Sequence, residues 1–204
     1  YMVLPCYNEE EVLPETSRQL REKYEALIAA DKISDKSRIV FVNDGSKDRT
    51  WSIIQELHEQ NPMFSGVNLS RNRGHQNALL AGLMTAKECA DMVISMDADL
   101  QDDIGVIDDM LREYYNGNDI VYGARSKRET DTFFKRFTAE SFYHMISMMG
   151  GEIVFNHADY RLMSKRALEE MAKYKEVNLF LRGIVPMIGF KTDVVTYERH
   201  ERMA

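Results

Sequence analysis

The stretch that decides the fold runs from Met92 to Asp99 and reads MVISMDAD. Its first five residues form a short, mainly apolar run, which is typical of a buried strand. Similar runs recur along the chain and alternate with longer helical patterns, which indicates an α/β domain with a mostly parallel, Rossmann-like central sheet flanked by helices. The predicted strands are Met2–Pro5, Ile39–Asn43, Gly66–Leu69, Met92–Met96 and Ile120–Gly123, and the predicted helices are Glu10–Ala30, Trp51–Glu59, Asn77–Lys87 and Ile104–Tyr115.

Length and composition predict one globular domain over residues 1–204, with 44% hydrophobic and 29% charged residues. The formal net charge of −7 argues against binding to nucleic acid, because neutralising phosphate backbones requires a basic face. Two cysteines are too few for a disulfide framework, which fits a reducing compartment. No apolar run approaches the roughly 20 residues that span a bilayer.

Asp97 and Asp99 follow the strand predicted at Met92–Met96 and form the strongest chemical signal in the chain. Side chains alternate along an extended segment, so we expect both carboxylates on one face. Two crowded carboxylates favour a hard divalent cation such as Mg²⁺ or Mn²⁺, with open positions for substrate phosphates. Gln101 lies two residues further on and offers an amide oxygen.

Two other strand ends carry polar residues. The turn Asn43–Ser46 contains Asp44, which is either a helix cap or an acceptor for a ribose or nucleobase hydrogen bond. Pro5–Glu9 places Tyr7 where it would wall a base and Glu9 where it would bond one. Neither turn has the glycine pattern of a dinucleotide fingerprint or a Walker loop, so any phosphates must be held by metal and side chains.

Four motifs in this order resemble glycosyltransferase family 2. They are Val3–Glu10 (VLPCYNEE), Val42–Ser46 (VNDGS), Ser70–His75 (SRNRGH) and Asp97–Asp102 (DADLQD). Within the family, the chain is most similar to the polyprenyl-phosphate hexose synthases, namely bacterial bactoprenol glucosyltransferases and dolichol-phosphate mannose synthase. Three later pieces agree with this resemblance: Tyr122–Arg125, Asp159–Leu162, and Arg199 with Arg202.

The resemblance implies a GT-A fold, an inverting displacement and a metal held at Asp97, Asp99 and Gln101. It implies base and ribose contacts from Pro5, Tyr7, Glu9 and Asp44, with Arg199 and Arg202 on the donor diphosphate. It also leads us to expect a juxtamembrane stretch and transmembrane helices beyond residue 204. One departure from the family pattern is Asp103–Gly105, where prolines usually follow the aspartate-rich turn.

The remaining candidates concern catalysis and the acceptor. Asp159 is either a catalytic or positioning carboxylate or a structural residue, as a strand-end cap or a partner of Arg161, and with Asp99 it completes the candidate catalytic residues. His75 is expected to be a solvated loop histidine rather than a base. Arg125 and Arg136 are predicted to bind an acceptor phosphate through their bidentate guanidinium groups. The aromatic and Met-rich residues 125–151 form either an amphipathic core helix or a helix that faces the acceptor or the membrane.

The leading hypothesis is an enzyme at the cytosolic face of the membrane that moves a hexose from a UDP-sugar to polyprenyl phosphate. One alternative is a transferase that extends a glycan or teichoic acid at a hydroxyl group. Another is a nucleotide-sugar binding module without activity. The sequence does not identify the sugar, and it leaves the oligomeric state open, with a homo-oligomer among the alternatives.

Overall fold

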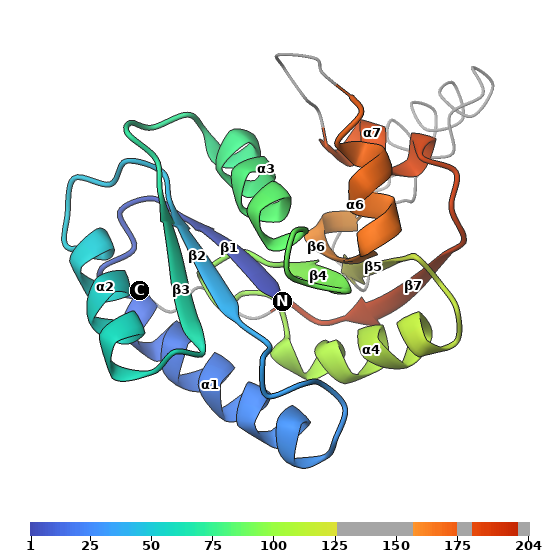
Figure 1. Ribbon diagram of the computed structural model, residues 1–204, viewed down its shortest axis with the longest axis horizontal. Coiled ribbons are helices and arrows are strands. Elements are labelled where there is room, and N and C mark those ends of the chain that lie inside the picture. The colour runs from blue at the N-terminus through green and yellow to red at the C-terminus, as the bar shows by residue number, and fades with distance from the viewer. Residues whose placement is uncertain (126–156, 175–180, 200–204) are drawn as a thin grey trace, which may run out of the picture.

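A computed structural model describes residues 1–125, 157–174 and 181–199, and Figure 1 shows their arrangement around one twisted sheet. The strand order in this sheet is β3-β2-β1-β4-β6-β5-β7. The strands are β1 (Met2–Cys6), β2 (Ile39–Asn43), β3 (Phe64–Asn68), β4 (Met92–Ser95), β5 (Ile120–Arg125), β6 (His157–Ser164) and β7 (Thr192–Tyr197). The helices are α1 (Leu13–Ala29), α2 (Thr50–Gln60), α3 (His75–Ala86), the 3₁₀ turn η1 (Ile104–Val106), α4 (Ile107–Tyr115), α6 (Lys165–Met171) and α7 (Leu181–Met187).

The first four strands form a parallel half of the sheet. Met2 pairs with Ile39 and Cys6 with Asn43, so β1 and β2 end at the same level. The next strand in the sheet, β6, runs antiparallel to both β4 and β5. Its amino-terminal end therefore lies at the edge where the carboxyl ends of β1, β2 and β4 lie. This reversal places residues from far along the chain beside the ends of the parallel strands.

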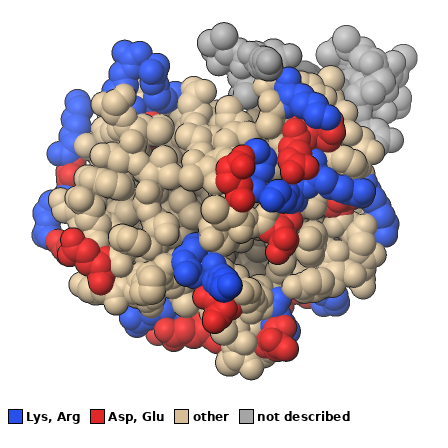
Figure 2. Space-filling model, viewed as in Figure 1, with Lys and Arg blue, Asp and Glu red and all other residues tan. Residues whose placement is uncertain are grey.

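Helices cover both faces of the sheet, as Figure 1 shows for α1, α2 and α4 on one side and α3, α6 and α7 on the other. Figure 2, in the same view, shows basic and acidic side chains interspersed on this face of the molecule. Side chains of β1 alternate between the two faces of the sheet: Met2, Leu4 and Cys6 belong to one buried cluster, and Val3 belongs to the other. β1 thus buries side chains on both faces, which explains why its sequence reads as a continuous apolar run. Gly82 lets α3 pack directly on the sheet, because a Cβ there would lie 2.4 Å from a methyl group of Val3.

The predicted α/β class, the five predicted strands and the four predicted helices are confirmed, with ends shifted by a few residues. The main differences are β6, α6, α7 and β7, none of which the sequence pattern predicted. β6 buries Asp159 and Arg161 within the strand, so its sequence lacks the apolar run that marks the other central strands. β7 pairs only with β5 in the described sheet, and several of its side chains are exposed.

Candidate active site

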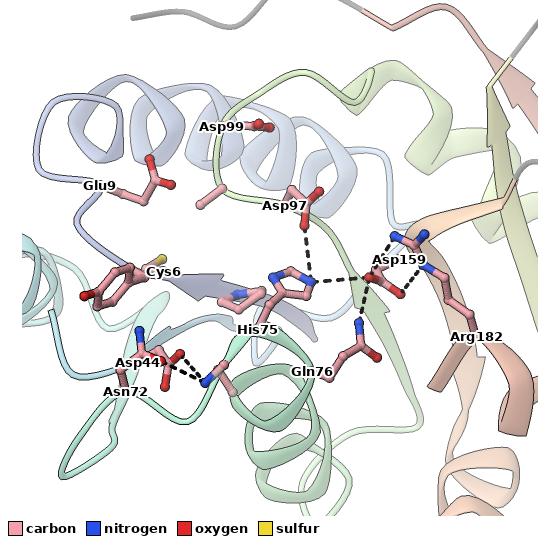
Figure 3. A pocket seen from close by; sticks show the side chains of 15 residues that line it. Cys6, Glu9, Asp44, Asn72, His75, Gln76, Asp97, Asp99, Asp159 and Arg182 are labelled. Atoms are coloured by element: carbon pink, nitrogen blue, oxygen red, sulfur yellow. Dashed lines mark hydrogen bonds and ion pairs between the residues drawn. The ribbon is translucent and has the colours of Figure 1, made fainter. Parts of the chain in front are cut away.

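A cleft of about 470 Å³ opens at the carboxyl ends of β1, β2 and β4, and Figure 3 shows it from close by. This is the edge where ligands bind in open α/β sheets. Ser95 of β4 pairs with Arg161 of β6, and beyond this pair Asp97 and Asp159 both lie near His75, whose Nε2 is 3.6 Å from Asp97 and 3.3 Å from Asp159. The lining residues are Pro5, Cys6, Tyr7, Glu9, Asp44, Asn72, Gly74, His75, Gln76, Ala78, Asp97, Ala98, Asp99, Asp159 and Arg182.

One end of the cleft, here called the Asp44 end, is lined by Pro5, Tyr7, Glu9 and Asp44. Asp44 is buried, and its carboxylate accepts hydrogen bonds from the backbone N–H groups of Arg73 (2.6 Å) and Gly74 (2.9 Å). It therefore fixes the loop before α3 and does not cap α2. Just before α2, Asp48 Oδ1 accepts a hydrogen bond from the N–H of Thr50 at 3.0 Å.

The turn at Asp44 is tightly packed against the loop that it holds. Gly45 has a φ of +65°, and a Cβ there would lie 2.5 Å from backbone atoms of Arg71 and Asn72. Only glycine suits both the backbone angle and the close approach. The geometry explains why a glycine follows Asp44, and it keeps the Asp44 carboxylate at the cleft wall.

The middle of the cleft is formed by the turn that carries Asp97 and Asp99. β4 ends at Ser95, so the two aspartates lie on a turn and the expectation of an extended segment is wrong. Both side chains still line the cleft. The hydroxyl of Thr16 donates to the carbonyl of Ala98 at 2.7 Å, and the N–H of Gln101 donates to Asp99 Oδ1 at 3.1 Å, which together fix the turn.

The other end, here called the Asp159 end, comprises Asp159, His75, Gln76, Arg161 and Arg182. Asp159 Oδ1 accepts from Arg161 Nη2 at 2.5 Å and from Arg182 Nε at 3.4 Å. Asp159 Oδ2 lies 3.3 Å from His75 Nε2 and accepts from Gln76 (3.1 Å) and Arg182 Nη2 (3.2 Å). Figure 3 shows His75, Gln76 and Arg182 converging on the one carboxylate. The interpretation of Asp159 as a partner of Arg161 is therefore confirmed.

The pKa values of Asp159 and Asp97, the two carboxylates near His75, are shifted in opposite directions. Burial alone would raise the pKa of Asp159, but the hydrogen bond from His75 and the charges of Arg161 and Arg182 outweigh it and hold that pKa well below its usual range. Burial raises the pKa of Asp97, and the nearby Asp102, Asp99 and Asp159 add to the rise. The hydrogen bond to Asp159 raises the pKa of His75. Asp159 is thus a firmly ionised carboxylate, whereas the attraction of His75, whose Nε2 lies 3.6 Å from Asp97 Oδ1, only partly offsets the rise in the pKa of Asp97.

The chemistry of the Asp97–Asp99 turn fits a divalent cation. Two carboxylates at one turn suit Mg²⁺ or Mn²⁺ when substrate phosphates and water complete the coordination. The raised pKa of Asp97 marks a place where a cation would stabilise the charged form. Within residues 1–125, 157–174 and 181–199, no group of three or more His, Cys, Asp or Glu side chains is arranged to hold a metal. Two carboxylates leave coordination positions open, so the residues fit a cation site that is shared with a phosphorylated ligand.

Three of the predicted residues that the structure describes, Gln101, Arg125 and Arg199, do not line the cleft. Gln101 accepts a hydrogen bond from Arg199, so these two predicted residues lie together. Arg125, at the end of β5, lies 3.4 Å from the hydroxyl of Tyr197 and 3.5 Å from Asp102. Arg136 and Arg202, together with the aromatic segment up to residue 151, lie outside the described residues. The roles predicted for these arginines stay predictions.

Sequence reasoning missed several groups at the Asp159 end. His75 is the first residue of α3, so the expectation of a loop position is wrong; its side chain is 44% exposed and contacts both Asp97 and Asp159. Arg182 and Gln76 were not singled out at all. His75 and Gln76 directly follow the Ser70–Gly74 loop, which was a usable signal. Arg182 neither follows a predicted strand nor belongs to a recognisable motif, so no local sequence pattern indicated a role for it.

Comparisons with known proteins agree with this geometry. Residues 1–172 match the family model described as glycosyl transferase family 2. The chain belongs to this family. It is 56% identical over 203 residues to the uncharacterized glycosyltransferase YkoT of Bacillus subtilis, and the match covers all of the chain and 60% of that protein. It is 42% identical over 204 residues to the prophage bactoprenol glucosyl transferase homolog of Escherichia coli, again over the whole chain and 64% of that protein.

Solved structures show that this family 2 glycosyltransferase has a GT-A fold. The mannosyltransferase PcManGT of Pyrobaculum calidifontis, solved with GDP-Man and Mn²⁺, superposes with a TM-score of 0.64 at 18% identity, covering 100% of this chain and 56% of that one. The chain spans 60–64% of the length of the two curated relatives. Among the described helices, none combines the length and apolar character needed to cross a membrane.

Proposed function

We propose that this family 2 glycosyltransferase moves a hexose from a UDP-sugar to polyprenyl phosphate, with inversion, at the cytosolic face of the membrane. The observation that carries the proposal is the layout of the cleft. The carboxylates of Asp97 and Asp99 lie between the Asp44 end, which suits a nucleoside, and the Asp159 end, where cationic groups gather. The 42% identity to a protein described as a bactoprenol glucosyl transferase homolog supports the acceptor class.

On the donor side, Tyr7 and Pro5 would flank the base, and Glu9 and Asp44 would accept hydrogen bonds from base and ribose. The donor diphosphate would then lie over Asp97 and Asp99, which would hold Mg²⁺ or Mn²⁺. That cation, when bound, would stabilise the negative charge that grows on the departing diphosphate. Arg199 and Arg202 are proposed to contact the same diphosphate.

On the acceptor side, the reaction is one displacement at the anomeric carbon. An acceptor oxygen forms the new bond to this carbon on the face opposite the diphosphate, and the old bond breaks with its electron pair leaving on UDP. A phosphate acceptor is already an anion at neutral pH, so no proton has to be removed. A hydroxyl acceptor would need a general base. The depressed pKa of Asp159 makes it a weak base, which favours the phosphate acceptor over the glycan hydroxyl.

The test is a donor and acceptor screen with the full-length protein in membranes. Radiolabelled UDP-sugars are supplied with polyprenyl phosphate and Mg²⁺ or Mn²⁺, and Asp99→Ala is the inactive control. We expect label from one UDP-hexose to enter the lipid extract. Label that enters a polymeric glycan or teichoic acid instead would show the hydroxyl-acceptor alternative. Nucleotide-sugar binding with neither transfer nor hydrolysis would show the binding module.

A further inference from the structure

Arg182 is a cleft residue to which neither the motifs nor the proposed mechanism assigns a role. It lies near the start of α7 and contacts Asp159 through both Nε and Nη2, at 3.4 and 3.2 Å. Its side chain is 47% exposed, whereas that of Asp159 is 5% exposed. One edge of the guanidinium group is therefore fixed against a buried carboxylate, while much of the side chain remains open to the cleft. An arginine has five N–H donors, so donors remain for a ligand.

Arg182 is a basic residue in a cleft that is lined mainly by acidic side chains. Five acidic residues line the cleft, namely Glu9, Asp44, Asp97, Asp99 and Asp159. Among the described lining residues, Arg182 is the only arginine or lysine, and His75 is the only other basic side chain. An anionic substrate that enters this cleft therefore meets several carboxylates and, among the described lining residues, only these two basic side chains. The open edge of Arg182 is thus the natural protein contact for a phosphate group.

Both carboxylate oxygens of Asp159 are already occupied by contacts with neighbouring side chains. Its two oxygens contact five groups, from His75, Gln76, Arg161 and both Nε and Nη2 of Arg182. Arg161 is 2% exposed, so its charge depends on Asp159 for compensation. A carboxylate that is already so fully bonded is well placed to orient Arg182 and poorly placed to accept a proton from a substrate.

The order of groups along the cleft decides which phosphate Arg182 meets. Figure 3 shows Asp44 at one side, Asp97 and Asp99 between, and Asp159 with Arg182 at the other side. A nucleotide at the Asp44 end with its diphosphate over the aspartate turn leaves Arg182 beyond the transferred sugar. We propose that Arg182 binds the phosphate group of the acceptor and that Asp159 is the positioning residue that orients Arg182, an inference that rests on the proposed function.

The test uses full-length protein with UDP-glucose and polyprenyl phosphate, each varied in turn. Arg182→Ala should raise the KM for polyprenyl phosphate by about 10-fold or more, as expected when a hydrogen bond to a charged group is lost. The KM for UDP-glucose should stay within about twofold, and Arg182→Lys should recover part of the loss. Arg166→Ala is the matched control. Arg166 likewise pairs with a buried aspartate, Asp119, with side chains that are 64% and 8% exposed, but it does not line the cleft.

Asp159→Asn separates positioning from base catalysis. A positioning role predicts a raised KM for polyprenyl phosphate and a kcat within about 10-fold of wild type at saturating lipid, whereas loss of a general base would lower kcat by about 10²–10⁴-fold. Should this variant fail to fold, the Arg182 variants still decide the proposal. A raised KM for UDP-glucose in Arg182→Ala, or no change in either KM, would overturn it. If wild type transfers the sugar to a hydroxyl and not to lipid phosphate, the proposed function itself fails, and this inference with it.

Discussion

The two ends of the cleft each hold a buried aspartate, but they hold it by different means. Asp44 is bound by two backbone N–H groups of the loop before α3. Asp159 is bound by side chains that come from α3, β6 and α7. The Asp44 end is therefore set by local turn geometry, whereas the Asp159 end is assembled by long-range charge pairing. Backbone donors favour a fixed nucleotide pocket, and side-chain cations favour a site that meets a second anion.

The largest effect should come from removing the buried charge partner at the Asp159 end. Breaking a buried ion pair by deleting one partner costs about 3–5 kcal/mol. We expect Arg161→Met to lower the free energy of unfolding by about 3 kcal/mol, near the low end of that range, because His75, Gln76 and Arg182 still contact Asp159. Urea unfolding measures this loss.

Arg182→Ala is the control for the Arg161 experiment, since it removes the exposed partner of the same aspartate. We expect it to cost less than about 1 kcal/mol, as for exposed ion pairs. Equal losses in the two variants would contradict the distinction between a buried structural arginine and an open ligand-binding one.

A smaller but still large effect concerns the turn between the two ends. Asp99→Ala should weaken metal-dependent binding of UDP by at least about 100-fold, because even outer-sphere partners of a metal contribute about 10–100-fold to affinity. Calorimetric titration of UDP with Mn²⁺ and with chelator measures this. Wild-type affinities that are equal in the two conditions would argue against the metal assignment.

The smallest effect is the pH dependence that His75 contributes. Its pKa is raised in the folded state, so its stabilisation is present below the unfolded value of about 6.5 and is lost as pH rises through the higher folded value. We expect a loss below about 1 kcal/mol between pH 6 and 9, because the side chain is 44% exposed. His75→Gln should weaken the dependence of the urea unfolding midpoint on pH over this range, measured with a chelator present. A profile that matches wild type would show that the contact with Asp159 adds nothing.

The contrast between the two ends also explains what the sequence could predict. Strands β1, β2 and β4 are mainly apolar runs that end in polar turns, so the positions of Asp44, Asp97 and Asp99 at one edge followed from the sequence pattern and from the topology of parallel sheets. All three line the cleft. Their predicted contacts with nucleotide and metal stay predictions.

The Asp159 end escaped prediction for physical reasons. β6 carries a buried Asp and a buried Arg, and a strand stabilised by such a pair has no hydrophobic signature. Its antiparallel direction also could not be read from residue spacing. Arg182 reaches Asp159 only because α7 packs beside β6, which is a tertiary contact with no local pattern. The sequence analysis predicted Asp159 and its pairing with Arg161, but it did not predict the contacts of Asp159 with His75, Gln76 and Arg182.

The division of the cleft is tested most directly by UDP affinity in two variants measured side by side. Asp44→Asn should weaken UDP binding by about 1.5–3 kcal/mol, whereas Arg182→Ala should leave it within about twofold. Asp48→Asn and Arg166→Ala are the matched controls, since neither Asp48 nor Arg166 lines the cleft and both make comparable contacts. Our account predicts loss in Asp44→Asn alone. Unchanged affinity in Asp44→Asn together with a loss in Arg182→Ala would contradict it.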